Sequence, residues 1–175
     1  MQAEPVKLFA ALLYREPEAL EAALRALAHC FSAVDHRGAA TPFDASDYYA
    51  PEMGTGLQRL VVGFSELLPP QELVQAKWQA HRIEHELSVE GRRRVNVDIG
   101  YLDRFKVVLA SFKARGNKIY LGQQVWADLT LVFQHGRWEA LPWTFPDFRA
   151  GRFHADLLAL RQRYLAQLRG GAAVP

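Results

Sequence analysis

The sequence predicts an α+β domain in which a mixed or antiparallel sheet packs against three helices. Strand-like alternation dominates the second half of the chain, whereas helical periodicity is confined to three stretches. In the first half the order strand, helix, strand, helix is compatible with a ferredoxin-like, split βαβ arrangement. A chain of 175 residues, 50% of them hydrophobic, suits one core, so we expect a single domain over residues 1–170 and a frayed tail at 171–175.

The first strand and the first helix are both predicted from short local signals. Val6 to Tyr14 is apolar, short and preceded by a proline, as expected of a buried strand. Pro17 suits the first turn of a helix. The helix that follows has one core face, which comprises Leu20, Leu24, Leu27 and Phe31.

A long irregular segment separates this helix from the next strand. His36 to Gly56 mixes Gly, Pro, Asp and Tyr, and loops of that length are often functional. Leu57 to Phe64 returns to strand character, and the prolines at 69 and 70 open a second helix over about Gln71 to Ser88. We assign one face of that helix to the core: Leu73, Ala76, Ala80, Ile83 and Leu87.

The second half is predicted to be a meander closed by a helix. Its strands are expected at 94–99, 105–113, 118–121, 125–134 and 137–141, with a tight turn at His135-Gly136. In the strand 125–134, alternation places Val125, Ala127, Leu129, Leu131 and Phe133 on one face. The last helix is marked by Phe153, Leu157, Leu160, Tyr164 and Leu168 and ends at the two glycines 170 and 171.

Composition narrows the function classes. The 21 basic and 19 acidic residues leave a formal charge of 21 − 19 = +2. The basic residues are scattered apart from the run Arg92-Arg93-Arg94, which disfavours nucleic acid as a partner. Cys30 is the single cysteine, so no intrachain disulfide can form. Its spacing in the predicted helix is that of a small core residue. Neither a membrane span nor a signal peptide is visible, and we expect a cytoplasmic protein without a membrane partner.

One five-residue pattern points to zinc. His81 and His85 flank Glu84 in the H-x-x-E-H order of inverted zinc peptidases, on a predicted helix. Spacing of four residues places both imidazoles on one side. Against this reading, a third acidic ligand is needed, and the two histidines also continue a partly covered helical stripe, so zinc is a minor alternative.

Two further segments combine polar groups that suit a ligand. Asp44 and Asp47 lie beside the phenols of Tyr48 and Tyr49 in the irregular segment, where they could hold a hard cation or cap a turn. On the predicted strand at 94–99, Arg94, Asn96 and Asp98 alternate to one face, while the valines between them face the core. This polar face could line a pocket floor or form an exposed surface with cross-strand pairs.

Taken together, these segments resemble a bacterial family catalogued as domain of unknown function 4416. The matching segments are 5–9 with Tyr14, 43–44, 47–49, 52–54, 56–57 with Arg59, Lys77, 94–98, 100–102, Lys106, 108–111, 119–122, 141–144 and 146–147. The sequence departs from the family pattern at Ile99 (usually proline), Asp128 (usually glutamate), and Phe145 and Phe148 (usually tyrosine). A GTP-binding label that some members carry has no support here, because the phosphate-loop and guanine-reading motifs are missing.

The resemblance implies a site, since its motifs are polar and aromatic. We expect an anionic small molecule, such as a nucleotide or a phosphorylated metabolite, with Arg59, Arg94 and Lys106 meeting the anion. A divalent metal and metal-assisted phosphoryl or hydrolytic chemistry would suit the carboxylates. The alternative is a non-catalytic domain that binds a protein partner. The candidate ligand-binding residues are Asp44, Asp47, Tyr48, Tyr49, Glu52, Arg59, Arg94, Asn96, Asp98, Tyr101, Lys106 and Asp147.

Overall fold

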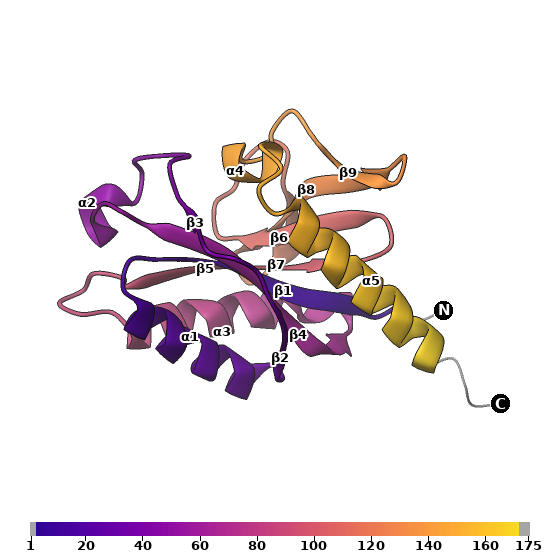
Figure 1. The fold of residues 1–175 in the computed structure, drawn as a ribbon, viewed down its shortest axis with the longest axis horizontal. Helices are drawn as coiled ribbons and strands as arrows, with labels where there is room; N and C mark the ends of the chain where they lie inside the picture. Colours follow the sequence, from indigo (N-terminus) through magenta and orange to yellow (C-terminus); the bar gives the residue numbers. More distant parts are fainter. Residues whose placement is uncertain (1–2, 172–175) are drawn as a thin grey trace.

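In the computed structural model, which describes residues 3–171, nine strands form one sheet between two helical layers (Figure 1). The strands are β1 (Val6–Tyr14), β2 (Val34–Arg37), β3 (Thr41–Pro42), β4 (Gln58–Leu68), β5 (Val95–Leu102), β6 (Lys106–Ser111), β7 (Ile119–Gly122), β8 (Val125–Gln134) and β9 (Arg137–Ala140). The helices are α1 (Pro17–Cys30), α2 (Ala50–Met53), α3 (Leu73–Glu86), α4 (Pro146–Arg149) and α5 (His154–Gly171), with a 3-10 turn at Pro70–Glu72.

The mixed α+β class is confirmed, but the number of helices was underestimated. The described residues contain five α-helices instead of three. The two additional ones, α2 and α4, have four residues each and carry a proline in their first turn. Single-turn helices of this kind lack the repeated apolar spacing that reveals longer ones. The predicted tail at 171–175 lies outside the described residues apart from Gly171, where α5 ends.

Every strand pair in the described sheet is antiparallel, in the order β2-β4-β1-β5-β6-β8-β7, with β3 beside β4 and β9 beside β8. The central strand β1 is buried along all nine residues, which explains why its sequence is apolar at every position except Lys7. Lys7 is fully buried, and its Nζ donates to Oδ2 of Asp35 at 2.6 Å. It pairs with β4 on one side and with β5 on the other.

Alternation along the strands gives the sheet two apolar faces. Leu8, Leu12 and Val97 point toward α1 and α3, which cover one face, whereas Phe9 and Val61 point toward α5 on the other (Figure 1). The predicted core face of α3 is confirmed, because its first four members are fully buried and Leu87 packs beside them.

The predicted alternation of β8 is wrong in its second half. In the β6–β8 ladder Val108 pairs with Leu129 but Val107 pairs with Leu131, so Thr130 is an extra residue. This bulge turns Leu131 toward the α5 side, while Leu129 packs on the side of α1 and α3. The irregular segment predicted from residue 36 also contains ordered strand, because β2 extends to Arg37 and β3 follows.

A small cap lies over one end of the α5 face. We use the name α2 cap for residues 43–57, which follow β3 and include α2. Its Met53 and Leu57 pack on Leu13 of β1, and Phe43 and Tyr49 pack beside them. α5 covers the rest of this face, and Arg59 of β4 lies against the ring of Phe43 in the cap.

No helix among the described residues is both long and apolar enough to span a membrane.

Candidate functional site

A buried arginine lies between the sheet, the α2 cap and α4. Arg59 of β4 is 5% exposed, and its Nη1 is 2.8 Å from Oδ2 of Asp147 in α4. Its Nη2 donates to Oδ2 of Asp98 in β5. The rings of Phe43 and Phe148 lie 5.6 and 5.7 Å from its guanidinium carbon. The guanidinium is therefore neutralised by two carboxylates within an aromatic surround.

This arrangement also fixes the ionisation of Asp98. Burial of the Asp98 carboxyl opposes its ionisation, but the positive charges of Arg59 and Lys77 outweigh that cost and lower its pKa. The group is therefore a carboxylate at neutral pH. Since Arg59 holds both Asp98 and Asp147, it has no outward-facing pair of donors for an anion.

Next to this group the sheet divides. The β5–β6 ladder covers three pairs, Gly100 with Leu109, Tyr101 with Val108 and Leu102 with Val107. We call the place past Gly100 and Leu109, where the two strands no longer pair, the fork. A Cβ at Gly100 would lie 2.4 Å from the carbonyl oxygen of Val108, so glycine permits the close backbone approach just before the strands diverge.

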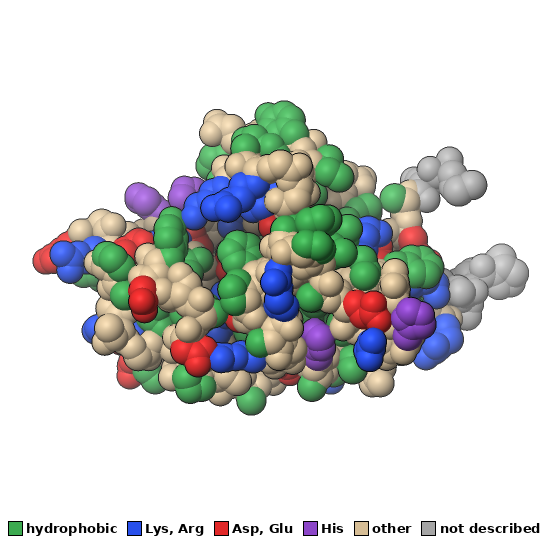
Figure 2. Space-filling view, turned by 90° about the horizontal axis from the view of Figure 1, so that it is seen from above, with side chains coloured by type: hydrophobic (Ala, Val, Ile, Leu, Met, Phe, Trp, Pro, Cys, Tyr) green, Lys and Arg blue, Asp and Glu red, His purple; other side chains and the backbone are tan. Residues whose placement is uncertain are grey.

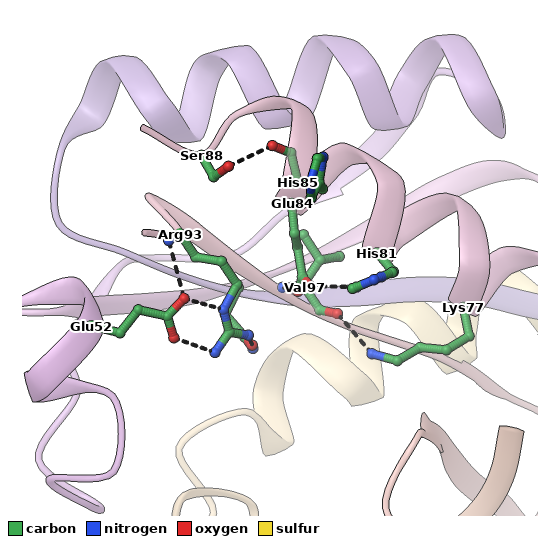
Figure 3. A network of polar contacts seen from close by, with 9 residues as sticks. Glu52, Lys77, His81, Glu84, His85, Ser88, Arg93 and Val97 are labelled. Atoms are coloured by element: carbon green, nitrogen blue, oxygen red, sulfur yellow. Dashed lines mark hydrogen bonds and ion pairs between the residues drawn. The ribbon is translucent and has the colours of Figure 1, made fainter. Parts of the chain in front are cut away.

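Side chains of α3 occupy the unpaired strand edge at the fork (Figure 3). Glu84 accepts a hydrogen bond from the backbone N–H of Val97 at 2.5 Å, and Lys77 donates to the carbonyl oxygen of Val97 at 3.5 Å. Both side chains are buried. Burial raises the pKa of Glu84 despite these contacts. Two charged side chains thus take the place of the missing strand partner of Val97.

Arg93 joins the α2 cap to β5 (Figure 3). Its Nε and Nη2 donate to the two oxygens of Glu52 at 2.8 and 2.6 Å, and its backbone N–H donates to the same carboxylate. Its Nη1 donates to Oδ1 of Asn96 at 2.6 Å. Two parallel hydrogen bonds from one guanidinium group to one carboxylate form the strong, bidentate type of arginine ion pair. Hydrogen bonds from Arg93 lower the pKa of Glu52.

A groove of about 540 Å³ opens beside this contact. The groove lies between the end of β1, helix α2 and the segment that precedes β5. A tight turn at Glu90 and Gly91, both with positive φ, brings the segment before β5 to the groove. The lining residues are Arg15, Glu16, Ala50, Pro51, Glu52, Met53, Gly54, Val89, Glu90, Arg92, Arg93 and Arg94. Four arginines and three glutamates therefore surround one hollow, and we call it the arginine groove.

Within the arginine groove, Glu16 bridges two arginines. One of its oxygens accepts a hydrogen bond from Arg15 Nη2 at 3.2 Å, and the other accepts from Arg94 Nε at 2.8 Å and from Arg94 Nη2. All three side chains are partly exposed. Arg92 is exposed and makes no side-chain hydrogen bond or ion pair with any residue in the described part of the chain.

The structure brings together only part of the predicted site. Arg59, Asp98 and Asp147 are in direct contact, and Glu52 and Asn96 are joined through Arg93. Tyr49 lies over this group, with its ring 5.8 Å from the guanidinium carbon of Arg93, and burial raises its pKa. Arg94, which was expected on the same strand face as Asn96 and Asp98, precedes β5 and turns to the arginine groove instead.

The remaining candidates lie elsewhere. Asp44 pairs with Arg152, and Asp47 is exposed with its backbone carbonyl bonded to the N–H of Ala50. Tyr48 is exposed and accepts a hydrogen bond from Lys113. Tyr101 and Lys106 line a separate hollow of about 300 Å³ near the other end of β5, where Lys106 pairs with Asp103.

The histidine pair on α3 does not assemble a ligand set with Glu84. His81 is exposed, and its Nδ1 lies 3.7 Å from Oε2 of Glu84, which turns inward to Val97. In the range 3–171 no group of three or more His, Cys, Asp or Glu side chains is placed to hold a metal ion.

Sequence reasoning missed Arg15, Glu16, Arg92 and Arg93 as site residues. The run Arg92-Arg93-Arg94 was visible as the densest basic cluster, but the sequence alone does not reveal which member turns inward. Arg15 and Glu16 lie between the first strand and the first helix, which is the place where a short connection exposes polar side chains. That position was the available signal for both residues.

The protein is thus an α+β protein whose single described sheet carries a charged network and an arginine-lined groove at one end. The family model described as domain of unknown function (DUF4416) matches residues 4–164, and the chain belongs to this family. Comparisons with curated proteins and with solved structures gave no match.

The Glu52–Arg93 contact predicts a pH dependence of stability. The pKa of Glu52 is lower in the folded state than its ordinary value near 4.5, so its contribution is present above that pH and is lost as pH falls through the lowered pKa. The variant E52Q lacks this contribution at every pH. We therefore expect the difference in unfolding free energy between wild type and E52Q, measured by urea denaturation, to shrink between pH 6 and pH 3.

The matched control is E66Q, which alters an exposed glutamate of β4. The assignment would be contradicted if the wild-type to E52Q difference changed with pH no more than the wild-type to E66Q difference.

Proposed function

We propose that this protein binds a small anionic molecule, a nucleotide or another phosphorylated metabolite, in the arginine groove. The observation that carries the proposal is the lining of the groove, where four guanidinium groups surround a hollow of about 540 Å³. That volume is within the range of small-molecule sites, which is roughly 300–1,000 Å³. Guanidinium groups bind phosphate oxygens through paired, charge-assisted hydrogen bonds.

The charges of the groove favour a small anion over a long polyanion. Its four arginines and three glutamates give a local charge of 4 − 3 = +1. Basic and acidic side chains are interspersed over the face seen in Figure 2, and that face carries no broad area of one charge. A long nucleic acid would draw on many separated phosphate contacts.

An anion in the arginine groove would lie away from two of the three residues expected to meet it. Arg59 is buried between Asp98 and Asp147, and Lys106 lies at the other hollow, so Arg94 is the expected residue that lines the groove. Arg15 and Arg92 also line the groove, and they join Arg94 as the proposed anion-binding residues. Asp98 and Asp147 act as the structural counter-charges of Arg59.

The strand order also supports the ferredoxin-like arrangement that we propose for the first half. β4 lies between β1 and β2, and β1 lies between β4 and β5, so the segments containing α1 and α3 each cross over an intervening strand. In this arrangement the connection from β1 to α1 supplies Arg15 and Glu16, and the connection from α3 to β5 supplies Arg92 to Arg94.

Arginine substitution tests the binding proposal. We expect inorganic pyrophosphate and nucleoside phosphates to raise the melting temperature of the wild type, and R92Q and R94Q each to weaken binding about three- to tenfold, since each removes one charge-assisted contact. R137Q, which alters an exposed arginine of β9, serves as the control. Equal affinities of R94Q, R92Q and R137Q would contradict the proposal.

A complete lack of binding would favour the alternative of a protein-interaction domain. The edge strand β7 would be its surface, because Ile119, Tyr120 and Leu121 are 69%, 59% and 41% exposed.

A further inference from the structure

Glu16 already places an anionic group inside the arginine groove. Its carboxylate lies between the guanidinium groups of Arg15 and Arg94 and accepts hydrogen bonds from both. Resting on the proposed function, we infer that Glu16 is an internal substitute for the ligand: a phosphate group displaces the Glu16 side chain and binds between Arg15 and Arg94.

The contacts of Glu16 are the ones that an incoming anion can replace most easily. The side chains of Arg15, Glu16 and Arg94 are 54%, 37% and 38% exposed, and exposed ion pairs contribute little to stability. Glu16 is the residue before α1, yet its side chain makes no hydrogen bond to the helix end. It can therefore swing away without uncapping the helix.

The second carboxylate of the groove is held more firmly. Glu52 accepts three hydrogen bonds from Arg93, including one from its backbone N–H, and the two side chains are 33% and 28% exposed. Displacing Glu52 would also break the link between the α2 cap and β5. We therefore infer that the ligand takes the place of the Glu16 carboxylate, while the contact between Glu52 and Arg93 persists in the bound state.

The geometry selects the class of anion. The two oxygens of a carboxylate already serve both arginines, so a ligand displaces Glu16 only if it offers more charge or more acceptors. A phosphate monoester carries up to two negative charges and three terminal oxygens, enough for Arg15, Arg94 and the unpaired Arg92 together. It would also lie at the N-terminal end of α1, where the helix dipole favours negative charge.

Arg15 is placed for this role by a close approach to the α2 cap. A Cβ at Gly54 would lie 2.6 Å from Arg15 Nη1, and Gly54 has φ of +82°, so a side chain at that position would displace the guanidinium. The glycine thus keeps the space in which Arg15 faces the groove.

The test compares two charge-matched variants. E16Q and E90Q each remove one negative charge from the lining of the arginine groove, but only Glu16 bridges two arginines. The dissociation constant of inorganic phosphate is measured at low salt by NMR titration, with the arginine Nε–H signals as reporters. We expect E16Q to bind phosphate about two- to fivefold more tightly than wild type, the gain that follows from removing an exposed ion pair.

The variant E90Q distinguishes displacement from a general charge effect. Its gain should be smaller than that of E16Q, and phosphate should shift the Arg94 Nε–H signal in wild type. Equal gains in E16Q and E90Q, or weaker binding by E16Q, would overturn the inference while leaving anion binding in place. Failure of all three proteins to bind phosphate or pyrophosphate would overturn the proposed function and the inference with it.

Discussion

Replacing Arg59 by alanine is expected to lower the free energy of unfolding by about 3–5 kcal/mol, the cost of leaving a buried charge without its partner. The substitution removes the shared counter-charge of Asp98 and Asp147, and the Asp147 side chain is only 4% exposed. It also removes the cation that the rings of Phe43 and Phe148 surround. Urea denaturation at neutral pH measures the effect directly.

The control is an arginine–aspartate pair at the surface. Arg152 pairs with Asp44, whose side chain is 68% exposed, so R152A should cost less than about 1 kcal/mol. If R59A were no more destabilising than R152A, Arg59 would not be the shared counter-charge that stabilises Asp98 and Asp147. A second variant, D98N, retains the shape of the side chain and should be destabilised less than R59A, because Asp147 still neutralises Arg59.

Replacing Glu84 by alanine is the second large expected effect, with a loss of about 3 kcal/mol. The variant leaves the N–H of Val97 without an acceptor at the fork and removes a negative charge near the buried Lys77. E84Q retains a hydrogen-bond acceptor and should lose clearly less. The measurement is urea denaturation, combined with hydrogen exchange of the Val97 amide, which should speed up in E84A.

Glu86 provides the comparison on the same helix. It is 62% exposed and its side chain lies 3.7 Å from Arg82, so E86A should change stability by less than about 0.5 kcal/mol. A similar loss in E84A and E86A would show that the side chain of Glu84 does not replace a strand partner.

The strands and the core faces could be predicted because their signals are local. β1 is buried over its whole length, and the sequence from Val6 to Tyr14 is apolar enough to define both ends. The face of α3 that includes Leu73 and Ile83 follows from helical spacing. Asn96 and Asp98 were placed correctly on one side of β5, but the alternation does not extend back to Arg94, since the strand begins at Val95.

The partners of the charged residues could not be predicted, because they depend on contacts between distant segments. Glu84 was considered beside His81 and His85 as part of a metal pattern, whereas it turns inward to Val97 of β5. Nothing in the sequence near Val97 shows that β6 diverges there. The bulge at Thr130 is similar: a single extra residue reverses the direction of Leu131 without changing the apparent alternation.

The fork also divides the sheet into two halves that are joined by a short ladder. Three residue pairs join the half formed by β2, β3, β4, β1 and β5 to the half formed by β6, β8, β7 and β9. Packing across this seam is supplied by helices. On one face α3 contacts Val97 of β5 and also Phe112, which follows β6. On the other face Leu157 and Leu160 of α5 share a cluster with strands of both halves. The connection between the two halves of the sheet is therefore narrow and covered by helices on both faces, and we expect any relative motion of the halves to occur where β5 and β6 diverge at Gly100.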